Sequence, residues 1–314
     1  MTLSQSFTAG LMALALSAGT AIAQAAAPLG PLVTATELEA AQNTHDPLIL
    51  DIRGEPYKEA HIPEAISAPY GLFRGPKDNP GQLVPEDVLE TTLQTLGVTP
   101  DRPIVIVHEG ANETDFGAAA RVYWTLKSAG LDELSILNGG FRAWTAAKLE
   151  TSQTATTPTP STIDIAFSDQ WLATTDEVLA VVSGEEEALL LDARPESFWS
   201  GNAWHPAAAQ PGTLPQSQYF EHANWFSNGP AIVDAAAARS LAQDQGLSEN
   251  EALISFCNTG HWAATNWFAL SELAGLDNLK LYPESMVGYS NAGHEMANVP
   301  GFFRHLYNQV RNVF

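Results

Sequence analysis

The sequence has one cysteine, Cys257, and only 14 lysines and arginines against 36 aspartates and glutamates. A single thiol has no disulfide partner within the chain. The formal net charge of −22 argues against nucleic acid or an anionic membrane surface as a partner, because both bind basic protein surfaces. It also means that an anionic substrate must be attracted by a local field, since the overall field repels it.

Other features are missing as well. No stretch after residue 25 is apolar enough for a transmembrane helix, so we expect no membrane insertion once a signal segment has been removed. The histidines lack the spacing of metal ligands, and no glycine-rich nucleotide loop is present. We therefore expect neither a metal nor a dissociable cofactor.

The first 25 residues contain no Lys, Arg, Asp or Glu. Leu11–Leu16 forms a short apolar core, and small residues offer cleavage after Ala23 or Ala25. This pattern predicts a secretory signal peptide over residues 1–25 and a periplasmic or otherwise exported protein. The core lacks a preceding basic residue, which leaves an uncleaved tail as the alternative. An unpaired cysteine is unusual in an exported protein.

In the remainder of the chain, four sequence features occur in the same order in the first half and again in the second half. The repeated features are a capping box, an apolar strand that ends in Asp-x-Arg, a second apolar strand, and an Ala-Gly-Leu-Asp segment after a helix. They lie at Thr34–Glu37 and Thr174–Glu177, Asp51–Arg53 and Asp192–Arg194, Ile104–Val107 and Leu253–Phe256, and residues 129–132 and 274–277. This repetition predicts a duplicated fold.

Strands that alternate with helices predict parallel sheets with helices on both faces, so the fold class is α/β with two similar domains. We place the first domain at residues 30–150, a Thr-, Ser- and Pro-rich linker at 151–163, and the second domain at 164–314. In the first domain we expect helices through Gln42, at Pro85–Leu96 and at Ala118–Ala129, and strands at Leu48–Asp51, Ile104–Val107 and Leu134–Leu137.

The segment around Cys257 is the one on which function depends. Cys257 follows a short buried strand and precedes a helix that is expected to begin near Ala263. The turn amides and the helix N-terminus would form a bowl suited to an anion. A thiol at the rim should have its pKa lowered to roughly 3.5–7.5 and act as a nucleophile. The alternative is a buried, inert cysteine.

Alignment of the two halves places His108 opposite Cys257, so the first domain has no thiol at this position. The following segment, Glu109–Asp115, is an insert with three carboxylates. Such a loop would repel an anion. We therefore expect the first domain to be catalytically silent and to serve as packing partner and cleft wall.

These features resemble the rhodanese (sulfurtransferase) superfamily in its tandem form, with an inactive first domain and an active second one. The resemblance is carried by both Asp-x-Arg segments, by His61–Pro63, by the turn at residues 139–144, and by the loop from Cys257 to Trp262. It implies that Cys257 accepts a sulfane sulfur as a persulfide. It also implies that loop amides hold the outer sulfur and the donor anion, at Asn258, Thr259, Gly260, His261, Trp262 and Ala263.

The sequence departs from the thiosulfate enzymes of that family at two positions. Thr259 stands where they carry a basic residue, and Phe198 stands where they carry an arginine. The mercaptopyruvate enzymes have a Gly-Ser-Gly type loop, of which only Gly260 is kept. The phosphatases that share the fold need an arginine at the position of Ala263 to clamp phosphate, so a phosphatase is not expected.

The other candidates each have a structural and a functional interpretation. Asp192 and Arg194 are expected to form a structural ion pair near the site. His261 is expected either to hydrogen-bond an anionic donor or to point to solvent. Among the aromatic residues, Trp262, and with it Trp204 or Trp225, would line the cleft, whereas the rest would pack in the core.

The first hypothesis is an exported sulfurtransferase that moves sulfur from a small anionic donor, thiosulfate or a related compound, to a thiol or cyanide-like acceptor, protein thiols included. The alternative is a periplasmic carrier that a partner loads with sulfur and that turns over little on free donors. A third hypothesis is an inactive scaffold with an unreactive Cys257. The sequence does not identify the physiological donor or acceptor, the oligomeric state or the role of the insert.

Overall fold

The computed structural model describes residues 28–301, and the expected signal peptide therefore lies outside the described residues. The first half contains a parallel sheet of order β1-β5-β4-β2-β3. Its strands are β1 (Leu32–Val33), β2 (Leu48–Asp51), β3 (Ile66–Ser67), β4 (Ile104–Val107) and β5 (Leu134–Leu137). The residues of β2, β4 and β5 are all buried, as expected for a parallel sheet that is covered on both faces.

The second half contains a smaller parallel sheet of order β7-β6-β8-β9. Its strands are β6 (Leu189–Asp192), β7 (Gln218–Tyr219), β8 (Leu253–Phe256) and β9 (Leu279–Leu281). An isolated parallel bridge from Leu172 to Leu281 takes the place that β1 has beside β5 in the first sheet. Two parallel sheets flanked by helices confirm the predicted α/β class.

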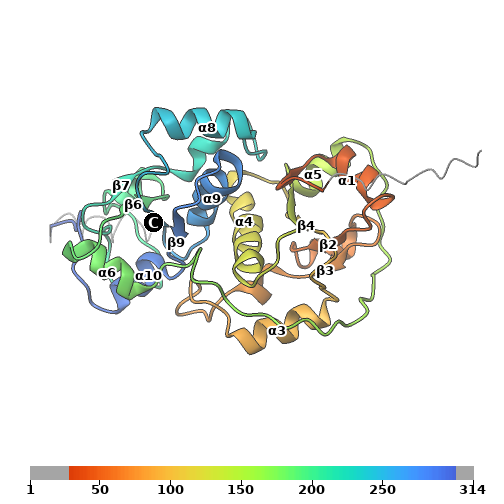
Figure 1. Cartoon of the computed structure of the whole chain (residues 1–314), viewed down its shortest axis with the longest axis horizontal. Coiled ribbons are helices and arrows are strands. Elements are labelled where there is room, and N and C mark those ends of the chain that lie inside the picture. The colour runs from red at the N-terminus through yellow and green to blue at the C-terminus, as the bar shows by residue number, and fades with distance from the viewer. Residues whose placement is uncertain (1–27, 302–314) are drawn as a thin grey trace, which may run out of the picture.

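Helices cover both sheets, and Figure 1 shows the two sets side by side. In the first half they are α1 (Ala35–Gln42), α2 (Pro56–Glu59), η1 (Tyr70–Phe73), α3 (Glu86–Thr95), α4 (Glu113–Ser128) and α5 (Gly140–Ala146). In the second half they are α6 (Thr175–Ser183), α7 (Glu196–Trp199), η2 (His222–Trp225), α8 (Ala235–Asp244), α9 (Trp262–Phe268), η3 (Ala269–Ala274) and α10 (Ser285–Asn291). Both predicted capping boxes are present, at the starts of α1 and α6.

Helix α4 begins earlier than the sequence pattern predicted. It starts at Glu113 rather than Ala118, because the Asn112 side chain accepts a hydrogen bond from the amide of Asp115 and caps the first turn. The acidic insert is therefore partly helical. Carboxylates in the first turn of a helix are favourable, since they lie beside the positive end of its dipole.

The two halves share one apolar core, which α4 and α9 join at the centre of the molecule (Figure 1). Phe116 of α4 contacts the Phe268 ring at a centroid distance of 5.5 Å, and Tyr123 contacts the same ring at 5.0 Å. A side chain on Gly117 would come within 2.9 Å of the His261 ring. The loop after Cys257 is thus pressed against the first domain.

The segment expected to be an exposed linker is irregular but attached to the first domain, around which it runs in Figure 1. Ser152 exchanges backbone hydrogen bonds with His61, at 2.9 and 2.8 Å. Further along, the amide of Ser161 donates to the carbonyl of Gln94. These bonds fix the path of the chain between the two sheets.

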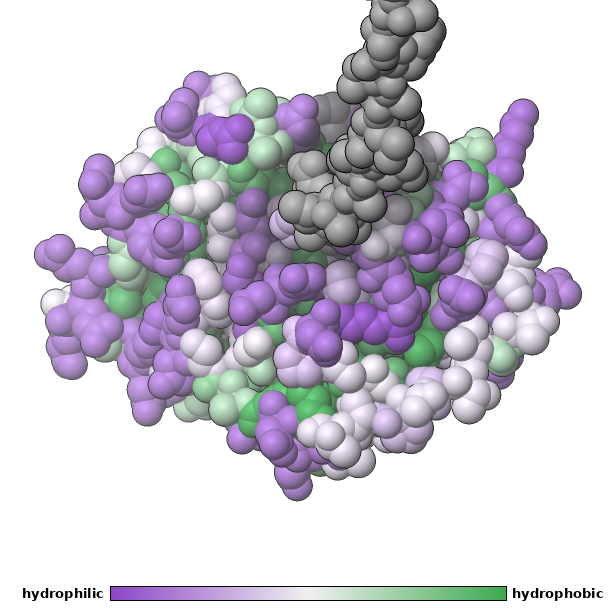
Figure 2. Space-filling view, turned by 45° about the vertical axis from the view of Figure 1, so that its right-hand side comes forward, coloured by the Kyte–Doolittle hydropathy of each residue, from purple (hydrophilic) through white to green (hydrophobic). Residues whose placement is uncertain are grey.

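The face seen in Figure 2 is predominantly hydrophilic, with small and separate apolar patches. Large apolar side chains that are exposed within residues 28–301 are few, namely Leu72, Val88 and Val299. In the same range, no helix is both long and apolar enough to cross a bilayer.

Candidate active site

Cys257 lies directly after β8, at the carboxyl edge of the second sheet, where ligands bind in open parallel α/β folds. Its side chain is buried, with 1 % of its surface exposed. Helix α9 begins five residues later, at Trp262. The strand–turn–helix arrangement expected around this residue is present, with the helix starting one residue before Ala263.

Ser285 supports the loop from below. Its Oγ accepts hydrogen bonds from the amides of Cys257 at 3.0 Å and Gly260 at 3.2 Å, and it donates to the carbonyl of Tyr282 at 2.7 Å. Ser285 has a φ of +51°, an uncommon conformation for a residue with a side chain. The Ser285 Oγ thus holds Cys257 and Gly260, the first and fourth residues of the loop, through one oxygen atom. The sequence analysis did not single out Ser285, because it lies 28 residues after Cys257.

Several loop amides have no acceptor among the described residues. They are the amides of Asn258, Thr259, His261, Trp262 and Ala263, which belong to the turn and the first residues of α9. Gly260, with a φ of +67°, lets the loop turn, and a Cβ here would lie 2.6 Å from the carbonyl oxygen of Pro283. Free amides at the start of a helix are suited to bind an anion.

Asp192 and Arg194 form a buried bidentate ion pair beside the loop. Arg194 Nε donates to Asp192 Oδ1 at 2.9 Å, and Arg194 Nη2 donates to Oδ2 at 2.6 Å. The same arginine donates to the carbonyl of Gly212 and to Asn258 Oδ1, at 2.9 and 3.3 Å. All these donors are used within the protein, so the pair holds Asn258 in place rather than facing a substrate.

Two arginines of the first domain contact the loop, and the sequence analysis did not identify either one. Arg74 Nη1 donates to the carbonyl of Thr259 at 2.9 Å. Arg121, which is fully buried in α4, donates to the carbonyls of Thr259 and Gly260 at 3.4 Å each. The loop sequence itself contains no lysine or arginine. The fold brings Arg74 and Arg121 to it, although they precede Thr259 by 185 and 138 positions.

Burial lowers the pKa of Arg121 to about 9, and the positive charge of Arg74 contributes to the shift. The attraction to Cys257 and Tyr70 acts in the opposite direction. Arg121 is therefore still a cation at neutral pH. Its charge lies close to Cys257, and opposite charges attract strongly in a buried site.

The side chain of His261 forms hydrogen bonds with the first domain. Its Nε2 donates to the carbonyl of Thr114 at 2.8 Å, so its Nδ1 is an acceptor, to which the Tyr70 hydroxyl donates at 3.0 Å. Burial lowers the pKa of His261 to about 4, with a further contribution from Arg74. The imidazole is therefore neutral at pH 7. It joins the loop to the first domain, whereas a donor anion would meet only its backbone amide.

Aromatic rings surround the loop. Trp262 stacks on His222 with the centroids 5.0 Å apart and meets Phe198 edge-on at 5.7 Å. Trp225, in contrast, is a core residue, whose Nε1 donates to Asn266 Oδ1 at 2.8 Å. Of the tryptophans considered for the cleft wall, Trp262 thus lies at the loop, and Trp225 packs behind it.

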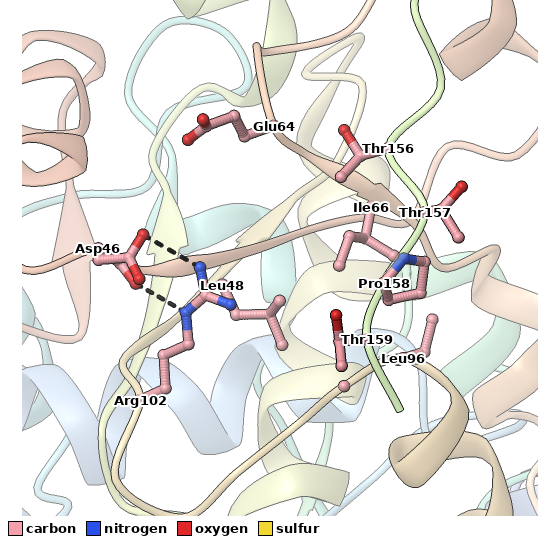
Figure 3. Close-up of a pocket in the computed structure, with 11 residues that line it drawn as sticks. Asp46, Leu48, Glu64, Ile66, Leu96, Arg102, Thr156, Thr157, Pro158 and Thr159 are labelled. Carbon is pink, nitrogen blue, oxygen red and sulfur yellow. Dashed lines mark hydrogen bonds and ion pairs between the residues drawn. The ribbon is translucent and has the colours of Figure 1, made fainter. Parts of the chain in front are cut away.

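The larger cavities lie elsewhere. One of about 290 Å³, shown in Figure 3, is lined by Leu48 at the amino end of β2, by the Asp46–Arg102 ion pair, and by Thr156–Thr159 of the linker segment. This cavity lies at the amino ends of the strands of the first sheet, whereas His108 lies at their carboxyl ends. In residues 28–301 no three His, Cys, Asp or Glu side chains are grouped to hold a metal ion.

This fold and this site define a class: a two-domain parallel α/β protein with one cysteine on an amide-lined loop at the domain boundary. The model of the family named Rhodanese, the rhodanese-like domain, matches residues 34–147 and again residues 174–292. The chain therefore belongs to the rhodanese-like family and carries the domain twice.

Named relatives agree with this assignment. The thiosulfate sulfurtransferase of Pseudomonas aeruginosa is 26 % identical over 245 residues, which cover 78 % of this chain and 85 % of that protein. The 3-mercaptopyruvate sulfurtransferase of Escherichia coli is 25 % identical over 228 residues, covering 72 % and 79 %. These relatives support a sulfurtransferase function at the level of the family, which implies a sulfur donor and a thiophilic acceptor.

Solved structures extend the likeness in fold. The anaerobic ergothioneine biosynthesis enzyme of Chlorobium limicola, solved with trimethyl histidine, superposes with a TM-score of 0.75 at 17 % identity. The match covers 86 % of this chain and 71 % of that one. At this identity, the likeness shows the fold alone.

Proposed function

We propose that the protein moves a sulfane sulfur from a small anionic donor to a thiophilic acceptor through a persulfide on Cys257. The observation that carries this proposal is the loop itself. Cys257, the only thiol of the chain, lies among backbone amides that have no acceptor within residues 28–301. It also lies beside the buried Arg121 and the half-buried Arg74. This arrangement is suited to the negative charge of a donor and to the charge that develops on the transferred sulfur.

The reaction has two displacement steps. In the first, the Cys257 thiolate attacks the outer sulfur of the donor. The new Sγ–S bond forms while the donor's bond to that sulfur breaks, and the leaving group keeps the electron pair, as sulfite would from thiosulfate. In the second step, an acceptor thiolate or cyanide attacks the outer sulfur, and the Cys257 thiolate leaves with the electron pair. Neither step needs a cofactor or an external oxidant.

Water must be kept away from the persulfide between the two steps. The thiol is almost fully buried, and Trp262 and Phe198 lie over the start of α9. Burial of this extent requires the mouth of the site to open for the donor and again for the acceptor. Thiosulfate and 3-mercaptopyruvate are the donors to test first, because the named relatives carry these two substrates in their names.

The test is intact mass under non-reducing conditions after incubation with thiosulfate or with 3-mercaptopyruvate. We expect an increase of about one sulfur atom, reversed by cyanide and absent in Cys257→Ser. A cysteine that alkylates readily but takes sulfur from neither donor would indicate the partner-loaded carrier instead. A thiol that reacts with no reagent would exclude sulfur transfer and leave the scaffold hypothesis.

We further propose that the protein is exported, on the strength of its uncharged, apolar first 25 residues. Secretion with cleavage after Ala23 or Ala25 would give a mature chain that begins at Gln24 or Ala26. N-terminal sequencing of protein from the periplasmic fraction checks this. An intact Met1 in that fraction would instead show an uncleaved tail.

A further inference from the structure

Arg74 and Arg121 have no carboxylate partner within residues 28–301, although both are withdrawn from solvent. The chain has 36 acidic residues to 14 basic ones, so ion-pair partners are abundant. Within the part of the chain that the structure describes, the cations that do contact a carboxylate are Arg53, Lys58, Arg102, Lys127, Arg142, Arg194 and Lys280. A cation that is withdrawn from solvent without such a partner can bind an external anion.

The two unpaired guanidinium groups converge on one atom. Arg74 Nη1 lies 2.9 Å from the carbonyl oxygen of Thr259, and Arg121 Nη1 lies 3.4 Å from the same oxygen. Each charge lies close enough to raise the electrostatic cost of the other. No Lys or Arg occurs in the sequence from Cys257 to Leu279. Arg194 also contacts the loop, at Asn258, but it is paired with Asp192, so Arg74 and Arg121 are the cations at the loop that no carboxylate of the described residues neutralises.

The two arginines differ in what remains available to a ligand. Arg121 is fully buried and directs its Nη atoms to three carbonyls, those of Thr259, Gly260 and Gly81, while its Nε has no acceptor. Arg74 is half-buried and directs only Nη1 to a carbonyl. Tyr70, His205 and His261 also lie near Arg74, and none of them is an anion, since burial raises the pKa of the Tyr70 phenol. Arg74 is thus the cation that an entering anion can reach.

We propose that Arg74, a residue of the first domain, binds the anionic group of the donor at the Cys257 loop, so that the donor site is built from both domains. This inference rests on the proposed function. The donor class is a small molecule with a carboxylate or a sulfur oxyanion next to the transferred sulfur. A guanidinium binds such a group through two parallel N–H donors, and the free amides of the loop bind the outer sulfur.

The first test measures binding and needs no sulfur transfer. Thiosulfate and pyruvate, the latter as a non-reacting carboxylate, are titrated into Cys257→Ser by calorimetry. We expect at least tenfold weaker binding of both anions when Arg74→Gln is added, and a partial recovery with Arg74→Lys. The control is Lys77→Gln, which removes the same charge from an exposed residue three positions away, and we expect less than a twofold change. Unaltered binding in Arg74→Gln, or no binding of either anion to any variant, would overturn the proposal.

The second test uses turnover in the chain with Cys257 intact. Arg74→Gln should raise KM for an anionic donor at least tenfold while kcat changes less than threefold, because the contact is formed already in the bound ground state. A loss confined to kcat would assign Arg74 to loop positioning and contradict a binding role. Absence of turnover in the unsubstituted protein, together with Arg74-dependent binding, would reject the proposed reaction but keep the anion site.

Discussion

The two domains carry the same loop framework at the carboxyl edges of their sheets, but only the second has a thiol on its loop. The amide of Phe141 donates to the carbonyl of His108 at 2.8 Å in the first domain, and the amide of Met286 donates to the carbonyl of Cys257 at 3.1 Å in the second. These matching bonds make His108 the counterpart of Cys257 in structure as in sequence. They also make Gly140 the counterpart of Ser285.

The first difference lies in the residue below the loop. Ser285 gives the second loop a hydroxyl that accepts from two amides. A Cβ on Gly140 would lie 2.5 Å from the His108 carbonyl oxygen and 2.6 Å from the Gly110 amide nitrogen. The first loop therefore packs directly on its glycine and has no space for a supporting side chain.

The second difference is the charge that faces each loop. In the first domain, Asp115 Oδ2 accepts from the amide of Ala111 at 2.8 Å, so the chain's own carboxylate occupies a loop amide. Glu109 pairs with Arg53 and Arg142. In the second domain, the amides of Asn258 and Thr259 have no acceptor within residues 28–301, and Arg74 and Arg121 have no carboxylate partner there. A strand–loop–helix frame alone therefore does not make an anion-binding site. Such a site also needs amides without an internal acceptor and cations without an internal carboxylate partner.

The most demanding test of this comparison moves the thiol. Cys257→Ser should lower sulfur transfer at least about a thousandfold, because it removes the nucleophile. Adding His108→Cys to that variant should not restore activity, since Asp115 occupies the first loop and no cation is unpaired there. Sulfur transfer rates of the single and double variants check this. Recovery beyond about one per cent of the original rate would show that the thiol alone separates the two domains.

The second test makes the Cys257 loop resemble the His108 loop. Ser285→Gly removes the hydroxyl without straining the backbone, since glycine tolerates the φ of +51° found here. We expect kcat/KM to fall about 10- to 100-fold, which is less than the loss of about 100- to 1,000-fold for a donor that contacts the reacting group directly, because Ser285 acts through the loop amides. Ser285→Ala also lacks the hydroxyl but keeps the unfavourable φ, so it should be less stable than Ser285→Gly. Full activity in Ser285→Gly would mean that the loop holds its shape unaided.

The smallest expected effect concerns the buried imidazole of the first domain. Burial lowers the pKa of His108 to about 4, against 6.5 in the unfolded chain. Between these values the unfolded chain binds more protons, so stability is lost as the pH falls through this window. Because of this histidine, the free energy of unfolding should be lower at pH 5 than at pH 7 by on the order of 2 kcal/mol.

Urea unfolding of the unsubstituted protein and His108→Gln, at both pH values, measures that cost. The variant should lose less stability on acidification than the parent protein. His261→Gln serves as the matched variant in the second domain, since its imidazole has a similarly lowered pKa of about 4 and should give a similar difference. Equal losses in all three proteins would show that neither histidine is kept neutral by the fold.

Much of this protein could be predicted from its sequence, because the decisive signals are local. Buried strands read as continuous apolar runs, the capping boxes at Thr34 and Thr174 mark helix starts, and the recurrence of these landmarks in one order indicates two similar domains. The position of Cys257 between a strand and a helix follows from the same pattern. The start of α4 was misplaced because its cap, Asn112, lies within a segment that reads as an acidic loop.

The environment of Cys257 was decided by the tertiary structure. Arg74, Arg121 and Tyr70 reach the loop because α4 packs against α9, and no spacing in the sequence connects residues separated by more than 130 positions. The same packing turns the His261 ring toward Thr114 and keeps it neutral. Local sequence thus determined the frame and the position of the thiol. Long-range packing supplied the unpaired charge, because the loop sequence carries no Lys or Arg and Arg194 of its own domain is paired with Asp192.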